Sequence, residues 1–210
     1  MARKMKHAHP SDVGRAELKL ALIILVLVVL VVGVIFALAY TFEKTKLETQ
    51  FAQYPKTYSQ FVERFAAENE LDPHFVYAVI RTESKFDETA VSTAGAVGLM
   101  QITPRTFDWM KTKMDDIDEL DAGSLYVPDV NIKVGTFLLR FLYDTFGDWN
   151  VTLAAYNAGY GSAMNWLDDP EISPDGKTFD VEKIPYGETK NYIKKVNAAK
   201  QRYDELYNEK

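Results

Sequence analysis

The chain of 210 residues contains no cysteine, so it can form no disulfide bond and carry out no thiolate chemistry. This absence suits a protein that works outside the cytoplasm, where thiols are oxidised. Only three histidines are present, and His7 and His9 stand in a basic tail, where we interpret them as solvated. The acidic stretch 115–121 lacks the glycine and the ligand spacing of a calcium loop. The sequence therefore predicts no metal site and no cofactor.

Charged residues are almost absent between positions 18 and 40, where Lys19 is the only one. The stretch is mostly leucine, valine and isoleucine, and a helix needs about 20 apolar residues to cross a bilayer core. The charges at or before its start are mainly positive: Arg3, Lys4, Lys6, Arg15 and Lys19 against Asp12 and Glu17. Positive charge favours the cytoplasmic side. We predict a cytoplasmic basic tail (1–17), a single-pass transmembrane anchor in the cell membrane (18–40) and an extracytoplasmic remainder.

A cleaved signal peptide is the alternative for this stretch, because Ala37-Leu38-Ala39 forms a small-x-small cleavage site. The apolar run is longer than the roughly 7–15 residues of a signal-peptide core, which favours a retained anchor. Beyond it, the polar residues 41–56 are interpreted as a stalk. Residues 57–205 are predicted to form the globular domain.

Basic residues are outnumbered beyond the anchor. Residues 1–40 hold 5 basic and 2 acidic residues, which leaves 19 basic and 28 acidic residues in 41–210, a net charge of −9. Nucleic acids are bound by clustered lysine and arginine, so we predict no nucleic-acid partner. An acidic domain also has no overall attraction to an anionic polymer. Any such substrate must be held by a shaped groove.

Strand patterns are nearly absent from the domain, whereas apolar residues recur there at helical spacing. Asp72-Pro73 and Thr103-Pro104 each supply an N-cap acceptor and a proline at the first helical position. Helices are predicted over about 58–69, from Asp72-Pro73, over 103–109, over 129–147, from an Asn150 cap through Ala158, and from Glu188 to the end. The sequence Gly159-Tyr160-Gly161 is predicted to break the helix before it. We expect a mainly α fold, with at most a small strand pair around 90–102 and another near 172–182.

Glu83 stands where an apolar helix ends. Phe75, Val76, Val79 and Ile80 form one apolar face, and the spacing of Glu83 from the last two places it on that same face. An apolar setting withholds water from a carboxyl group and raises its pKa, which suits a general acid. An exposed or salt-bridged glutamate is the alternative, since that is the usual state of this residue type.

Small residues and hydrogen-bonding side chains surround Glu83 in the sequence pattern. The segment 94–98, AGAVG, allows a ligand to approach the backbone closely. Met100-Gln101 adds a thioether and an amide, and Tyr156-Asn157 places a phenol and an amide at the end of a later helix. Such groups suit a sugar, which presents hydroxyls and acetamides. Each residue taken alone also fits ordinary packing or a turn.

Taken together, these residues resemble the lytic transglycosylases with the soluble-transglycosylase (SLT) catalytic domain, a lysozyme-like fold related to goose-type lysozyme. The resemblance covers about 57–200. It rests on motifs in family order: Glu83-Ser84 with Phe86; Ala90, Ser92, Gly95-Ala96 and Gly98-Leu99-Met100-Gln101, with Pro104 and Thr106; Asn131-Ile132 and Gly135; Ala154 to Gly159; and Pro185, Glu188-Thr189 and Tyr192. Tyr160 stands where the family often has proline, and Phe107 where it often has alanine.

The resemblance implies that Glu83 is the sole catalytic acid and base, and that no cofactor takes part. It implies a groove lined by Ser92, Met100, Gln101, Tyr156 and Asn157, with a far wall closed by Glu188 and Tyr192. The implied substrate is the peptidoglycan glycan strand, cut at the β-1,4 bond between N-acetylmuramic acid (MurNAc) and N-acetylglucosamine (GlcNAc). The 6-hydroxyl of the muramic sugar would then attack C1, held in place by proximity, and leave a 1,6-anhydro end.

Other functions stay open on the sequence. A muramidase of goose-lysozyme type would use water as the acceptor and usually a second carboxylate, for which Asp87 and Asp108 are near in sequence but have no clear place. A non-catalytic wall-binding scaffold would keep the groove, although loss of Glu83 would be its natural mark. Service to a larger cell-wall complex is compatible with cleavage.

Overall fold

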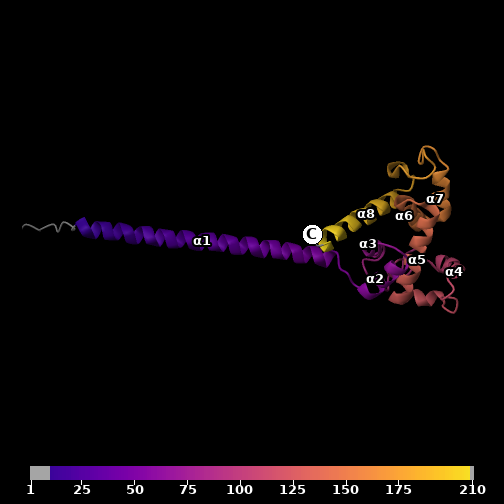
Figure 1. Cartoon of the computed structure of the whole chain (residues 1–210), viewed down its shortest axis with the longest axis horizontal. Coiled ribbons are helices and arrows are strands. Elements are labelled where there is room, and N and C mark those ends of the chain that lie inside the picture. The colour runs from indigo at the N-terminus through magenta and orange to yellow at the C-terminus, as the bar shows by residue number, and fades with distance from the viewer. Residues whose placement is uncertain (1–9, 209–210) are drawn as a thin grey trace, which may run out of the picture. The chain divides into compact units, whose positions relative to one another are not determined.

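The computed structural model describes residues 10–208 of the chain. Residues 1–9, which include His7, His9 and part of the predicted basic tail, lie outside the described residues. The chain divides into two units, 1–53 and 54–210. Within 10–208 the regular elements are all helices (Figure 1), so the predicted mainly α fold is confirmed.

The first unit contains one helix, α1 (Pro10–Gln53). In the described part of the chain, it is the one helix that is long and apolar enough to cross a membrane. Its most apolar stretch is not buried against protein. Because α1 runs without a break to Gln53, most of the predicted stalk continues the same helix. A signal sequence meets the same criteria of length and composition, so the anchor stays a prediction.

The second unit is built around α3 (Pro73–Glu83). Residues His74–Ile80 are all buried, so this helix is covered on every side, which is typical of a helix inside a core. The expectation of a single apolar face was too narrow, because α2 (Ser59–Glu68) and α8 (Gly187–Tyr207) both pack against α3. A central α3 brings its last residue, Glu83, to the interior of the unit.

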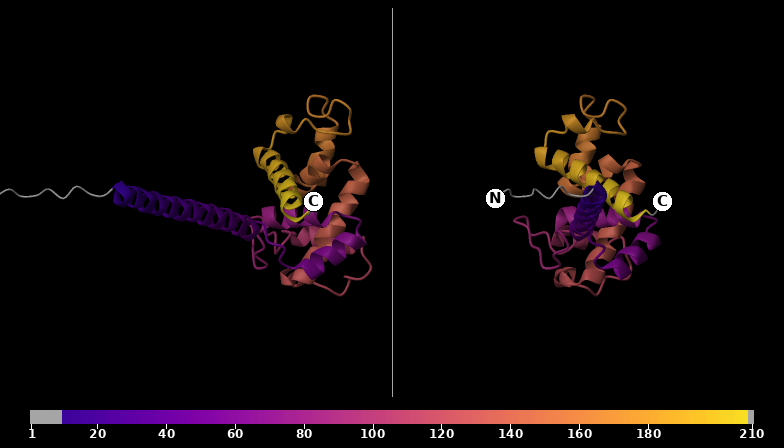
Figure 2. Two further views of the ribbon diagram at one scale, coloured as in Figure 1. Left: turned by 60° about the vertical axis from the view of Figure 1, so that its left-hand side comes forward. Right: turned by 90° about the vertical axis from the view of Figure 1, so that its left-hand side faces the viewer.

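The other elements of the second unit surround α2, α3 and α8. They are α4 (Pro104–Lys111), α5 (Pro128–Phe146), α6 (Trp149–Ala158), α7 (Tyr160–Leu167) and the short 3-10 helices η1 (Ala122–Tyr126) and η2 (Val181–Lys183). α5 packs on α2 and α6, and α6 also packs on α7 and α8. The segment between α7 and α8 projects at the end of the domain away from α2 (Figures 1 and 2).

Helix ends follow the predicted capping chemistry at several places. The Asp72 side chain accepts a hydrogen bond from the His74 backbone N–H at 2.8 Å, and Thr103 accepts one from Thr106 at 3.1 Å. A proline follows each cap at the first helical turn. Gly147 ends α5 with φ of 70°, a left-handed conformation that glycine adopts readily. These predicted starts and ends are confirmed.

Of two local predictions around α6, that of the N-cap was wrong, and that of the break after the helix is confirmed at Gly159 alone. Its N-cap is Asp148, whose side chain accepts a hydrogen bond from the Val151 backbone at 2.9 Å, whereas Asn150 bonds to Asn197 of α8. A cap one residue earlier also satisfies a helix N-terminus, and the sequence does not separate the two. Gly159 alone breaks the helix, with φ of 92°, and the next residue already begins α7.

In the described residues, the region of the first predicted strand pair contains isolated β-bridges and no regular strand. Val97 bridges to both Val91 and Ile102, and these are isolated bridges. Val97 and Ile102 exchange two backbone hydrogen bonds of 3.0 and 3.1 Å. Turns on either side stop the ladder from growing. The segment 84–102 therefore has an irregular backbone whose shape depends on other contacts.

Candidate active site

A cavity of about 220 Å³ lies at the C-terminal end of α3, and Glu83 lines it. The other lining residues come from the irregular segment, the start of α4, α5, the end of α6 and the start of α8. They are Ser92, Ala94, Ala96, Gln101, Ile102, Thr103, Thr106, Leu138, Tyr156, Asn157 and Glu188. Segments far apart in the sequence thus meet at one carboxyl group. Of the predicted site residues, only Met100 and Tyr192 are absent from this lining.

The carboxyl group of Glu83 is largely withdrawn from water, and this desolvation raises its pKa to about 7. The Tyr192 hydroxyl lowers the pKa by hydrogen bonding, and the charge of Glu188 raises it. That hydroxyl is buried and has no hydrogen-bond partner of good geometry, so it lies close to Glu83 without being well aligned. A pKa near 7 leaves Glu83 able to donate a proton at neutral pH and, once ionised, to accept one.

The backbone turns sharply after Glu83. Lys85 and Phe86 both adopt left-handed conformations, with φ of 54° and 68°. Such conformations cost on the order of 1–3 kcal/mol for a residue with a side chain and persist where the surroundings enforce them. The Ser84 hydroxyl donates to the Leu99 carbonyl at 2.9 Å and so ties the end of α3 to the irregular segment. The position of Glu83 is therefore fixed from both sides.

Asn131 of α5 is fully buried and holds the backbone next to the cavity. Its amide nitrogen donates to the carbonyls of Val97 at 2.9 Å and Leu125 at 2.8 Å, and its amide oxygen accepts from the Met100 backbone at 2.7 Å. A Cβ at Gly98 would lie 2.4 Å from the Asn131 amide nitrogen, and φ at Gly98 is +76°, a conformation that glycine adopts without strain. The sequence marked Asn131 by resemblance alone, and the geometry gives it a positioning role.

Met100 and Gln101 stabilise this same stretch. The Met100 side chain is fully buried and packs on Gly135, where a Cβ would lie 2.4 Å from its sulfur. Its carbonyl accepts a hydrogen bond from the Tyr156 hydroxyl at 2.7 Å. Gln101 has φ of 50°, and its amide donates to the Gly98 carbonyl at 2.9 Å. Met100 thus contributes backbone to the site region, while Gln101 both stiffens the turn and lines the cavity.

Ser92 closes a tight turn at the cavity. Its hydroxyl accepts a hydrogen bond from the Ala96 backbone N–H at 3.0 Å, and its own N–H donates to the Ala96 carbonyl at 2.9 Å. Gly95 lies inside this turn with φ of 78°. The small residues noted in the sequence therefore form a compact turn that keeps bulky side chains out of the cavity.

Helix ends supply the rest of the polar lining. Asn157, in the last turn of α6, accepts a hydrogen bond from the Thr189 hydroxyl at 2.7 Å, which orients its amide. Burial, and to a lesser degree the Glu83 charge, raises the pKa of Tyr156 and of Tyr192 well above the usual value. Both phenols therefore stay protonated at neutral pH. Glu188, in the first turn of α8, is exposed.

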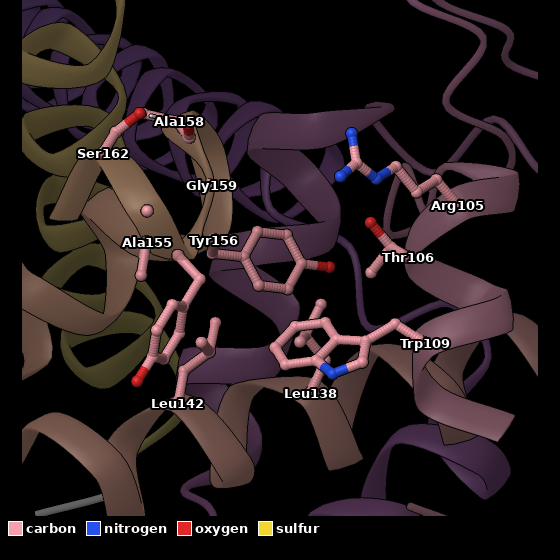
Figure 3. Close-up of a pocket in the computed structure, with 12 residues that line it drawn as sticks. Arg105, Thr106, Trp109, Leu138, Leu142, Ala155, Tyr156, Ala158, Gly159 and Ser162 are labelled. Carbon is pink, nitrogen blue, oxygen red and sulfur yellow. Dashed lines mark hydrogen bonds between the residues drawn. The ribbon is translucent and has the colours of Figure 1, made fainter. Parts of the chain in front are cut away.

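A second cavity, of about 670 Å³, adjoins the first. The two share Thr106, Leu138 and Tyr156 in their linings, so they lie side by side. Figure 3 shows side chains of α4 on one side of the larger cavity and the residues of α6 and α7 on the other. Sequence reasoning missed Arg105 and Trp109, because α4 was judged only by its cap and its apolar spacing.

This arrangement supports acid–base chemistry on a hydroxyl-rich ligand. One carboxyl group of raised pKa stands among amide, hydroxyl and phenol groups that can bind hydroxyls and acetamides. Among the described residues, no group of three or more histidine, aspartate or glutamate side chains could hold a metal ion. The side chains that line the cavity can transfer a proton and form hydrogen bonds to a ligand.

Several known proteins are similar to this chain in sequence and in fold. Residues 60–178 match the family model of the transglycosylase SLT domain. The soluble lytic murein transglycosylase of Escherichia coli is 36% identical over 157 residues, which cover 74% of this chain and 23% of that protein. The membrane-bound lytic murein transglycosylase C of Actinobacillus pleuropneumoniae is 33% identical over 172 residues, covering 70% of this chain and 46% of that protein.

Solved structures agree. An inactive mutant of the lytic transglycosylase Slt from Pseudomonas aeruginosa has a TM-score of 0.66 and 33% identity, covering 74% of this chain and 25% of that chain. A 70 kDa soluble lytic transglycosylase in complex with bulgecin A has a TM-score of 0.69 and 30% identity, covering 77% and 26%.

This chain spans about a quarter of the length of the soluble relatives that it matches. The family model covers more than half of the chain, and the matched structures share its helical, lysozyme-like fold. The resemblance drawn from the motifs is confirmed. The chain belongs to the transglycosylase SLT domain family.

Proposed function

We propose that this chain is a membrane-anchored peptidoglycan lytic transglycosylase that cleaves the β-1,4 bond between MurNAc and GlcNAc. The observation that carries the proposal is the desolvated Glu83, whose pKa is raised to about 7, in a groove of amide, hydroxyl and phenol groups. The activity in the names of the relatives supports it. The inactive mutant among the solved relatives is a glutamate-to-glutamine substitution, which agrees with catalysis by a glutamate.

In the proposed reaction, protonated Glu83 gives its proton to the bridging oxygen, and the bond from that oxygen to C1 of MurNAc breaks. The 2-acetamido group of the same sugar stabilises the positive charge at C1, in place of a second carboxylate. Ionised Glu83 then takes the proton from the 6-hydroxyl, whose oxygen bonds to C1. One C–O bond breaks and one forms, no water is consumed, and Glu83 ends protonated.

The surrounding side chains have distinct parts in this proposal. The Tyr192 hydroxyl favours ionised Glu83, whereas burial and the charge of Glu188 favour the protonated form, and the balance suits a group that must do both. Asn157, oriented by Thr189, and the lining residues Ser92, Gln101 and Tyr156 bind hydroxyl and acetamido groups of the strand. Met100 acts through its backbone, which anchors Tyr156.

A muramidase, which uses water as the acceptor, is the second candidate, and Glu188 is the observation that favours it. Its carboxylate lines the same cavity and acts electrostatically on Glu83. A second carboxylate is what most glycoside hydrolases use to activate water or stabilise the transition state. Asp87 and Asp108, the acids considered from the sequence, do not line the cavity.

For location, we propose that α1 is a retained single-pass anchor with the N-terminus in the cytoplasm and the catalytic unit outside. The length and composition of the helix support this, as does the positive charge at its start. The membrane-bound relative agrees with an attachment to the membrane. Peptidoglycan strands close to the membrane would be the accessible substrate.

The test is a digestion of purified peptidoglycan by the full chain in detergent, beside Glu83→Gln, with the products weighed by mass spectrometry. Anhydro-ended fragments, lighter by one water than reducing-ended ones and absent with the variant, are the expected result. Reducing-ended fragments would establish the muramidase instead. If neither form cuts walls that a known enzyme digests, the binding scaffold becomes the better account.

A further inference from the structure

The two cavities of the groove carry opposite charge. Among the described residues, the lining of the smaller cavity includes Glu83 and Glu188 and no basic side chain. The lining of the larger cavity includes Arg105 and no acidic side chain. Since the cavities share part of their linings, an acidic cavity and a basic cavity lie side by side.

Arg105 has no internal role that accounts for its charge. Arg64, Arg140 and Arg202 each pair with a carboxylate, whereas no ion pair between described side chains includes Arg105. It lies in the first turn of α4, where a positive charge opposes the helix dipole and does not stabilise the helix. The side chain is exposed on the groove, so its guanidinium is available to a ligand (Figure 3).

Aromatic side chains line the same cavity. Trp109 is held edge-on by Phe141, with ring centroids 5.3 Å apart, and Tyr160 lies 6.2 Å from Trp109. Tyr160 keeps 39% of its surface exposed. Aromatic faces combine apolar area with rigid geometry, which suits the apolar faces of sugar rings. At about 670 Å³ the cavity falls within the roughly 300–1,000 Å³ of small-molecule sites, whereas the 220 Å³ cavity alone lies below it.

We propose that the larger cavity continues the glycan-binding groove, and that Arg105 there binds a carboxylate attached to a muramic acid unit of the strand. A guanidinium presents a planar pair of donors that matches a carboxylate. Two carboxylates offer this chemistry: the lactyl group of a peptide-free strand and the acids of a stem peptide. Because Arg105 lines only the larger of the two cavities, binding of a carboxylate there favours the register of the strand that places a muramic acid unit beside it. This inference rests on the proposed function.

The test compares Arg105→Gln, Arg105→Lys and the wild-type full chain on soluble peptidoglycan fragments, with and without stem peptides. Each fragment is also tested after its carboxylates have been converted to amides. Arg105→Gln should raise KM for the recognised fragment about fivefold to tenfold and change kcat less than twofold, as expected for the loss of one accessible charged pair. Arg105→Lys should fall between. On amidated fragments the wild type and Arg105→Gln should have the same KM.

Arg202→Gln is the matched control, since Arg202 lies on α8, pairs with Glu205 and lines neither cavity. The fragment on which amidation removes the effect identifies the carboxylate. The inference is overturned if the wild type cleaves and Arg105→Gln leaves KM unchanged, or if its effect persists on amidated fragments. Failure of the proposed function looks different, because the wild type then yields no anhydro ends. Binding of the fragments to Glu83→Gln with and without Arg105→Gln, by calorimetry, still decides the inference in that case.

Discussion

One part of the lining around Glu83 is irregular backbone, and another part is helical. The irregular part, 84–102, contains no regular strand and takes its shape from buried hydrogen bonds, chiefly those of Asn131. The helical part consists of the end of α6 and the start of α8, whose backbone hydrogen bonds are made within each helix. A site residue on the first part therefore depends on a few side chains elsewhere, whereas one on the second depends mainly on its helix.

The difference extends to backbone strain. The irregular part, 84–102, includes Lys85, Phe86 and Gln101 with positive φ, conformations that side-chain-bearing residues seldom adopt. At the helical part, the positive φ belongs to Gly159, where it costs little. Strain next to the proposed acid makes the irregular part the more sensitive one.

Removal of the carboxyl group that both parts surround should have the largest effect. In Glu83→Gln the side chain keeps its shape but can neither donate nor accept the proton, so we expect kcat to fall about 10³-fold or more. The release of anhydro-ended fragments over time measures this. Thr145→Val, on the exposed surface of α5, is a control that should retain full activity. A Glu83→Gln variant with near wild-type turnover would remove Glu83 from the mechanism.

The same substitution should make stability less dependent on pH. The pKa of Glu83 is about 7 in the folded protein against an ordinary 4.5, so the folded state holds its proton more tightly than the unfolded state. This contribution is fully present below pH 4.5 and is lost as the pH rises to 7, with a total on the order of 3 kcal/mol. Relative to the wild type, Glu83→Gln should therefore gain stability over that window.

Urea unfolding at several pH values measures the difference, followed by tryptophan fluorescence, because Trp109, Trp149 and Trp166 all lie in the second unit. Equal pH dependence of the wild type and the variant between pH 4.5 and 7 would show that burial does not perturb Glu83. The proposal that desolvation keeps Glu83 protonated near neutral pH would then lose its physical basis.

Asn131→Ala should separate the two parts of the lining. The substitution removes all three hydrogen bonds of the Asn131 amide: the Leu125 carbonyl and the Met100 N–H lose this partner, and the Val97 carbonyl keeps only its bond from Ile102. We expect a loss of about 2–4 kcal/mol with a clear fall in activity. On the helical part, Thr189→Val removes one hydrogen bond to Asn157 and should cost about 1 kcal/mol. Urea unfolding and fragment release measure both.

Asn150→Ala is the control for a lost amide, since Asn150 bonds to Asn197 near the surface and should cost about 0.5 kcal/mol or less. If Thr189→Val proved as damaging as Asn131→Ala, the contrast between the two parts of the lining would not hold. The helical part would then depend on its side-chain contacts as strongly as the irregular part does.

The same contrast explains what the sequence could predict. Helical spacing and caps such as Asp72-Pro73 placed most helices, because a helix is encoded within its own residues. The sequence predicted one buried face for α3, whereas the helix is buried on every side, because α8 also packs against it. The shape of 84–102 was not predicted, because it depends on Asn131, which is distant in the sequence. Glu83 was found through its apolar setting, whereas Arg105 was missed because its signal is the lack of an ion pair, which only the fold reveals.

The smallest expected effects come from α8, which acts on Glu83 in two opposite ways. The Glu188 charge raises the pKa of Glu83, so Glu188→Gln should shift the alkaline limb of the kcat/KM profile to lower pH. The Tyr192 hydroxyl lowers that pKa, so Tyr192→Phe should shift the limb to higher pH. The direction follows because protonated Glu83 is the form that begins the reaction.

Both shifts of the alkaline limb are measured from profiles of kcat/KM on one soluble fragment. The profiles run from about pH 5 to about pH 9, a range that brackets a pKa near 7. If the alkaline limb moved in the same direction in Glu188→Gln and in Tyr192→Phe, the substitutions would act through the packing of α8 and not through charge and hydrogen bonding. If Glu188→Gln released no fragments of any kind, Glu188 would have a direct part in the chemistry. Opposite shifts with cleavage retained would instead show that α8 tunes a single carboxyl group, as a one-glutamate mechanism requires.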